Sequence, residues 1–214
     1  MDTIKCSMNT MSSASVSLFP IDSKPYGLTY GQWSAKWWHW LLSIPRSKSP
    51  AIDEDGQNAN VNQHDSNVFF LCQTVESMRG GKTAQDRTIF MRAGRSVFMP
   101  IINWVSVLYI DGHTDEDLVS IAKKKMDVVS ELELMIDGMR MKEGLEQYRA
   151  QSPFFEMMLP KDNIFQLTPG IIRLVADGYW LFLKPLEKNI KLTTYGSCSS
   201  GLNKFGINYQ ITLI

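Results

Sequence analysis

The feature that most constrains the fold is a tryptophan-rich segment, Thr29 to Pro45, which holds four of the six tryptophans in the chain. Thr29 followed by Gln32 forms a capping box, in which the threonine hydroxyl accepts from a backbone N–H of the first turn and the glutamine side chain reaches back. Proline cannot continue a helix, and it disfavours helical angles in the residue before it. The segment therefore predicts a short helix that begins near Thr29 and ends before Pro45.

The bulky side chains of this helix fall on one face. Five of them recur at helical spacing, namely Trp33, Trp37, Trp40, Leu41 and Ile44. A tryptophan buries roughly 150–250 Å², so the simplest interpretation is a hydrophobic plug on a sheet. The alternative is that Trp38, at the edge of the apolar stripe, lines a site that stacks on a sugar or another flat ligand.

Composition and charge exclude several classes of function. Lysine plus arginine number 22, and so do aspartate plus glutamate, so no general nucleic-acid-binding surface is predicted. No run approaches the roughly 18 apolar residues of a transmembrane helix. The N-terminal segment lacks the basic start and compact apolar core of a secretion signal, and three widely spaced cysteines form neither a disulfide framework nor a zinc knuckle. We therefore expect a cytoplasmic protein.

The chain divides into an arm and one domain. Residues 1–24 are rich in Ser, Thr and Met and show no periodicity, which predicts a flexible N-terminal arm. Within it, Val16, Leu18 and Phe19 are residues that suit pairing with the sheet edge of a neighbouring subunit. Residues 25–214 predict a single β-sandwich-like domain.

Short β-forming runs separated by turn signals at intervals of roughly ten residues indicate this sandwich. The clearest is Phe205 to Leu213, in which apolar and polar residues alternate as in an antiparallel sheet with one buried and one solvent-exposed face. A second helix is predicted to open at Thr114, with Asp117 completing a capping box. The predicted fold class is mainly β, with antiparallel sheets in a β-sandwich-like arrangement and two or three short helices, including the tryptophan-rich amphipathic helix.

Turn residues predict how the strands connect. Gly94 lies between two apolar runs and suits the positive φ of a tight turn that joins two strands. The dipeptides Asp137–Gly138 and Asp177–Gly178 are strong hairpin signals, so each predicts a hairpin. Pro100 cannot donate a ladder hydrogen bond, which places its neighbourhood at a sheet edge or a strand end.

Few residues point to catalysis. The sequence contains neither H-E-x-x-H nor G-x-S-x-G, so whether the protein is an enzyme stays open, and no cofactor is predicted. Cys72 lies in an apolar run and is expected to be an inert, packed thiol. The candidate metal ligands are His64, His113 and Asp111, which lie in predicted loops; the simpler interpretation is that these histidines are exposed loop residues.

The tryptophan-rich helix resembles the opening of a group of bacterial and archaeal proteins that share the pattern Y-G-x-W-x-x-x-W-W-x-W. These proteins continue with an Asp-containing loop, a V-x-F-L strand and an A-G-x-x-x-F-x-P-I-x-N segment. Asp53, Val68–Leu71 and Ala93–Asn103 match those pieces here. The resemblance extends over roughly residues 26–214 and implies a single domain, but the group has no established activity to carry over.

Three functions follow from these observations. The first is a noncatalytic β-sandwich binding protein that recognises a carbohydrate or a similar small-molecule ligand through Trp38, Tyr179 and Trp180. The second is a structural or assembly protein that forms a homo-oligomer through its N-terminal arm and its sheet edges. The third is a metal- or carboxylate-dependent hydrolase.

Overall fold

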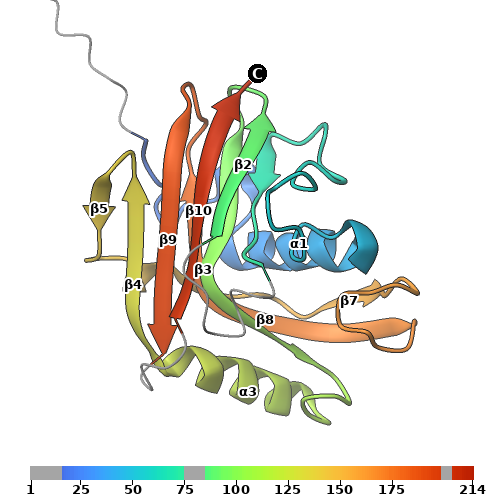
Figure 1. Ribbon diagram of the computed structural model, residues 1–214. Coiled ribbons are helices and arrows are strands. Elements are labelled where there is room, and N and C mark those ends of the chain that lie inside the picture. The colour runs from blue at the N-terminus through green and yellow to red at the C-terminus, as the bar shows by residue number, and fades with distance from the viewer. Residues whose placement is uncertain (1–15, 75–84, 199–203) are drawn as a thin grey trace, which may run out of the picture.

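The computed structural model describes residues 16–74, 85–198 and 204–214. Ten strands in these ranges form two five-stranded sheets (Figure 1). The first sheet has the order β1 (Val68–Phe70), β3 (Ser96–Val107), β8 (Ile171–Leu183), β6 (Arg149–Gln151), and β7 (Phe155–Met158) also pairs with β8. The second sheet has the order β2 (Gln85–Met91), β10 (Lys204–Leu213), β9 (Ile190–Cys198), β4 (Val129–Ile136), β5 (Met139–Met141).

The predicted fold class is confirmed: the described chain is mainly β, with two α-helices, α1 (Tyr30–Ser43) and α3 (Asp115–Asp127). Three short 3-10 helices add single turns at Pro25–Gly27, Arg46–Lys48 and Glu146–Tyr148. Both sheets are mixed, because β1 runs parallel to β3 and β2 runs parallel to β10. All the other neighbouring strands of the two sheets pair antiparallel, as predicted.

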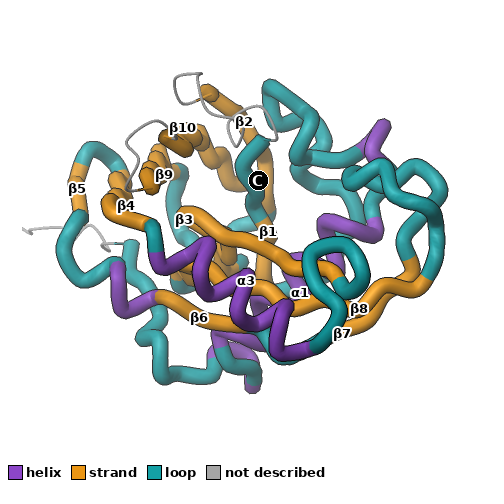
Figure 2. Tube along the Cα trace, turned by 90° about the horizontal axis from the view of Figure 1, so that it is seen from below, coloured by secondary structure: helices purple, strands orange, loops and turns teal. Residues whose placement is uncertain are grey.

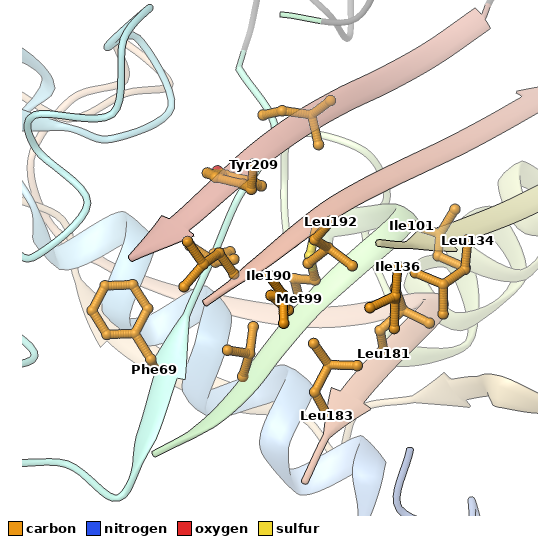
Figure 3. Packing of buried hydrophobic residues seen from close by; sticks show 14 of the residues in the cluster. Phe69, Met99, Ile101, Leu134, Ile136, Leu181, Leu183, Ile190, Leu192 and Tyr209 are labelled. Atoms are coloured by element: carbon orange, nitrogen blue, oxygen red, sulfur yellow. The ribbon is translucent and has the colours of Figure 1, made fainter. Parts of the chain in front are cut away.

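The central strands of the first sheet, β3 and β8, are buried on both faces over most of their length, which explains why they read as nearly continuous apolar runs. Because side chains alternate along a strand, Leu181 and Leu183 of β8 face the second sheet, whereas Trp180 and Phe182 face α1. Figure 3 shows the cluster between the sheets, where the side chains of β3 and β8 meet those of β4, β9 and β10. The protein therefore has three layers: the second sheet, the first sheet and α1.

Helix α1 begins where its capping box predicts. The Thr29 hydroxyl accepts from the Gln32 backbone N–H at 3.2 Å, and the Gln32 side chain accepts from the Thr29 N–H at 2.9 Å. Trp37 is fully buried and stands 5.5 Å from the ring of Trp180 between centroids. The hydrophobic-plug interpretation of this helix is thus confirmed for its central face.

Helix α3 also has its predicted capping box, formed by Thr114 and Asp117. Figure 2 shows α3 running beside β3 and β8. Arg149 of β6 joins the two elements, since it donates to Asp127 of the helix at 2.7 Å and to Asp177 of β8 at 2.6 Å. Asp177 lies on the same face of β8 as Tyr179, which packs in the cluster between the two sheets. One face of the first sheet is therefore covered by two elements, the second sheet over one part and α3 over another.

The Asp177–Gly178 hairpin prediction is wrong, because β8 runs straight through both residues. Asp177 and Gly178 pair with Trp104 and Asn103 of β3, and Asp177 also forms an ion pair with Arg149; these tertiary contacts hold the segment extended. The prediction for Pro100 is wrong as well. Strand β3 has β1 on one side and β8 on the other, and its ladder to β8 shifts register between Pro100 and Ile102, where a missing N–H is tolerated.

The tight turn predicted at Gly94 is confirmed, because Gly94 adopts a positive φ of 77° between β2 and β3. The two strands belong to different sheets, so the chain uses this turn to pass from one sheet to the other. The prediction at Asp137–Gly138 is confirmed. Both residues have positive φ, at 50° and 84°, as a two-residue hairpin turn requires, and they connect the antiparallel strands β4 and β5.

Part of the predicted N-terminal arm lies within the described residues, and residues 1–15 lie outside them. Leu18 forms an antiparallel bridge with Leu183 at the end of β8. The Phe19 N–H donates to the Phe182 carbonyl at 2.8 Å, and the Lys184 N–H donates to the Ser17 carbonyl at 2.8 Å. The segment around Leu18 therefore pairs with a strand of its own chain.

Candidate functional site

The structure does not bring the three predicted ligand-binding aromatics together. Tyr179 packs in the cluster between the sheets, with the Arg149 guanidinium carbon 5.9 Å from its ring centroid. Trp180 faces the other way and stacks on Phe98 with centroids 5.1 Å apart and an interplanar angle of 10°. Because neighbouring residues of a strand point to opposite faces, Tyr179 and Trp180 line no common surface.

Trp38 is the predicted aromatic that the structure places at a pocket. Its ring meets Trp37 edge-on, with centroids 4.9 Å apart, and faces Phe165 at 6.4 Å. Only 6% of Trp38 is exposed, and it contributes to the wall of a cavity of about 350 Å³. We call this cavity the Trp38 pocket; it is lined by Trp38, Asn103, Trp104, Val105, Val107, Ile110, Asp111, Phe165 and Leu167.

Four parts of the chain build the Trp38 pocket. Helix α1 supplies Trp38, strand β3 supplies one apolar wall, and the turn after β3 supplies Ile110 and Asp111. The loop between β7 and β8 supplies Phe165 and Leu167. Most of these side chains are apolar, and the volume falls in the roughly 300–1,000 Å³ range of small-molecule sites.

Asn163 fixes the conformation of the β7–β8 loop that forms this wall of the pocket. Its side chain is buried, donates to the carbonyls of Pro160 at 3.0 Å and Leu167 at 2.7 Å, and accepts from the Leu167 N–H at 3.0 Å. The same loop places Gln166 at a positive φ of 58°. Sequence reasoning missed this wall. The available signal was a pair of apolar residues, Phe165 and Leu167, in a segment that was not predicted to be a strand or a helix.

The candidate metal ligands are not gathered. His64 and His113 are exposed, and Asp111 accepts from the Val107 backbone N–H at 2.7 Å. Among the described residues, no group of three or more His, Cys, Asp or Glu side chains is placed to hold a metal ion. Asp111 thus closes the turn after β3 and forms part of the pocket wall.

Two arginines are buried, Arg87 within β2 and Arg95 directly before β3. Arg87 donates to the carbonyls of Pro50 and Cys72, and Arg95 donates to those of Gln63 and Val68. Their terminal guanidinium N–H groups therefore donate to backbone oxygens inside the protein.

Cys72 is buried, as predicted, at the end of this arginine network. Burial raises the pKa of its thiol to about 11, although the neighbouring Arg87 charge acts in the opposite direction. A thiol with that pKa is protonated at neutral pH, and the thiolate is the nucleophilic form. Cys72 is therefore a packed core residue.

A second hollow, of about 600 Å³, runs along the polar side of α1. Lys36, His39 and Ser43 line it together with the edges of Trp33 and Trp40. The indole N–H groups of both tryptophans already donate within the protein, to the carbonyls of Pro25 and Val61. The Trp38 pocket is the stronger candidate, because its walls are more apolar and it contains the predicted residue Trp38.

No known protein family and no curated protein matches the chain. A chain of the solved complex of PbICP-C with falcipain-2 aligns with 68% of this chain and 98% of its own length, at 8% identity and a TM-score of 0.27. A similarity at that level supports no inference about fold or function. In the part of the chain that the structure describes, no helix is long and apolar enough to span a membrane.

Proposed function

We propose that the protein binds a small molecule in the Trp38 pocket and does not transform it. The supporting observation is the pocket itself: a cavity of about 350 Å³ with a tryptophan and a phenylalanine in its wall. Such a cavity offers apolar contact on several sides, which is the main source of affinity in small-molecule sites. The resemblance noted in the sequence carries no activity, so this proposal rests on the geometry alone.

The lining favours a flat apolar ligand over a sugar. A sugar hydroxyl that enters an apolar wall loses its hydrogen bonds to water and must find replacements. Asn103 and Asp111 are the polar side chains of the lining apart from the tryptophan N–H groups, and one Asp111 oxygen already accepts from Val107. The carbohydrate expected from the sequence is therefore a weaker candidate for this pocket than an aromatic molecule.

The lining also suggests binding without catalysis. General acid–base chemistry needs a pair of groups that exchange protons with the substrate. The lining contains one carboxylate, Asp111, and neither a histidine nor a cysteine. A hydrolase would require a second ionisable group that these lining residues do not supply.

Titration of the protein with naphthalene, 2-acetylnaphthalene and cellobiose, followed by tryptophan fluorescence and calorimetry, tests the proposal. Leu167→Trp fills the pocket from its loop wall and should weaken binding of the aromatic probes at least tenfold. Ile171→Trp is the matched control, because Ile171 is exposed and outside the pocket, and it should leave affinity within twofold. Absence of aromatic binding, or equal effects of the two variants, would overturn the proposal.

Self-association is the second candidate function, and one observation favours it. Strand β5 is an edge of the second sheet, and Met139 and Met141 on it are 65% and 44% exposed. An exposed edge strand with apolar side chains is a template for pairing with another chain. Light scattering should then give a dimer mass for the wild type and a monomer mass for the Met139→Lys, Met141→Lys double variant; a wild-type monomer would remove this candidate.

A further inference from the structure

The Trp38 pocket concentrates hydrogen-bond donors without partners. In the described part of the chain, seven buried side-chain nitrogen or oxygen atoms have no hydrogen-bond partner in the protein. Three of the seven belong to residues that line this one pocket: Trp38 Nε1, Asn103 Nδ2 and Trp104 Nε1. Buried polar groups are nearly always paired, so this concentration requires an explanation.

Trp38 is the exception among the tryptophans of its helix. The N–H groups of Trp33, Trp37 and Trp40 donate to the carbonyls of Pro25, Leu71 and Val61 at 2.8–2.9 Å. The chain thus supplies an acceptor for each tryptophan N–H of α1 except that of Trp38, which is the tryptophan that lines the Trp38 pocket.

Asn103 lies on the same side of β3 as the wall residues Val105 and Val107, because side chains alternate along the strand. Opposite it on β8 stands Gly178, where an added Cβ would lie 2.6 Å from the Asn103 Cβ. The absence of a side chain at Gly178 therefore leaves room for the Asn103 side chain on this face of the strand pair.

Trp104 belongs to the other face. It packs against the cluster between the sheets, and Lys125 of α3 lies 4.6 Å above its ring. That leaves two unpartnered donors, Trp38 Nε1 and Asn103 Nδ2, on the α1 side of the sheet. The Asp111 carboxylate lies in the same wall. It disfavours a negatively charged ligand, because like charges in a poorly hydrated site repel.

We infer that the ligand is an uncharged, planar apolar molecule with a carbonyl-type oxygen, which accepts hydrogen bonds from Asn103 Nδ2 and Trp38 Nε1. The inference rests on the proposed function, since it assigns the chemistry of the molecule that the Trp38 pocket binds. A carbonyl group suits both donors, because its oxygen has two lone pairs.

Three probes with the same ring system test the assignment. Naphthalene has no hydrogen-bond acceptor, 2-acetylnaphthalene has a neutral carbonyl, and 2-naphthoate has a negatively charged carboxylate. Calorimetry should show the ketone binding about fivefold or more tightly than naphthalene, which corresponds to one net hydrogen bond. The naphthoate should bind more weakly than the ketone. Equal affinities for naphthalene and the ketone would overturn the assignment of the acceptor, and a naphthoate that binds as tightly as the ketone would overturn the requirement for a neutral ligand.

Variants separate the donors from the shape of the pocket. Trp38→Phe and Asn103→Leu each replace a donor with an apolar side chain, so the preference for the ketone should shrink while naphthalene still binds. Trp40→Phe is the control, since the Trp40 N–H is engaged with Val61, and it should keep the preference. A preference that persists in both donor variants, checked for native circular dichroism, would overturn the inference. If no aromatic probe binds the wild type, the proposed function itself fails.

Discussion

Asp53 and Arg87 form an ion pair of 3.1 Å inside the protein, with 4% and 0% of their side chains exposed. Arg87 also donates to the hydroxyl of Tyr209 at 2.7 Å and to the Pro50 carbonyl at 2.9 Å. Asp53 in turn accepts from three backbone N–H groups of its own loop, including that of Asn58 at 2.7 Å. The pair therefore ties the long loop after α1 to strands β2 and β10.

Removing the cation from this pair should be costly. Arg87→Met leaves Asp53 buried and without its counter-charge, and breaking a buried pair in this way costs about 3–5 kcal/mol of unfolding free energy. Urea denaturation measures the loss. Arg140→Met is the matched control, because Arg140 pairs with Glu133 at the surface, where such pairs contribute about 0–1 kcal/mol. Similar losses in the two variants would contradict a structural role for the buried pair.

The same pair predicts how stability depends on pH. Burial acts to raise the pKa of Asp53, but the N–H groups of Asn58 and Gly56 and the charge of Arg87 hold that pKa below its usual value. The folded state thus binds the proton less readily than the unfolded state. The stabilisation is complete above the unfolded-state pKa of about 3.9, and it is lost as the pH falls through the lower folded-state pKa.

Asp53→Asn isolates this contribution. The unfolding free energy of the wild type should fall more steeply between about pH 5 and the acid limit than that of the variant. Other carboxyls with lowered pKa values, such as Asp115 and Asp127, are present in both proteins and cancel in the difference. Parallel curves for the two proteins would show that Asp53 does not titrate differently in the folded state.

Local chemistry made the helices predictable. The capping boxes at Thr29 and Thr114 use residues three apart in sequence, and both form as predicted. Alternation over Phe205 to Leu213 likewise gave the strand β10. The Asp177–Gly178 signal failed because the residues that hold this segment extended, Asn103 and Trp104 of β3 and Arg149 of β6, are distant in the sequence.

The candidate site was predictable only in part, for the same reason. The sequence pointed to Trp38, but the other walls of the pocket come from β3 and from the loop after β7, and no periodic pattern connects such distant segments. The buried arginines were missed because their acceptors are mostly backbone carbonyls, which every residue carries. Tyr179 and Trp180 are adjacent in sequence and so invite a joint site, which the alternation of β8 does not support.

Gly178 should tolerate no side chain. A Cβ at this position would lie 2.6 Å from the Asn103 Cβ and 2.9 Å from the Ile102 carbonyl oxygen, and relieving such overlap typically costs about 1–3 kcal/mol. We expect Gly178→Ala to lower the urea midpoint and to displace Asn103. Gly170→Ala is the control, because nothing lies within 4 Å of its added Cβ. An unchanged Gly178→Ala variant would mean that the β3–β8 pairing is looser than described.

Asn163→Ala tests whether the β7–β8 loop is a wall of the site. The substitution leaves the Leu167 N–H and the Pro160 and Leu167 carbonyls without their partner. A buried group left unpaired in this way lowers the free energy of unfolding by about 1–3 kcal/mol. We expect weaker binding of 2-acetylnaphthalene together with this loss, because Phe165 and Leu167 are no longer held in place. Lys161→Ala, an exposed change in the same loop, should alter stability by less than about 0.5 kcal/mol and leave binding intact. If Asn163→Ala loses stability but keeps full affinity, Phe165 and Leu167 contribute nothing to the ligand, and the pocket must be closed by α1 and β3 alone.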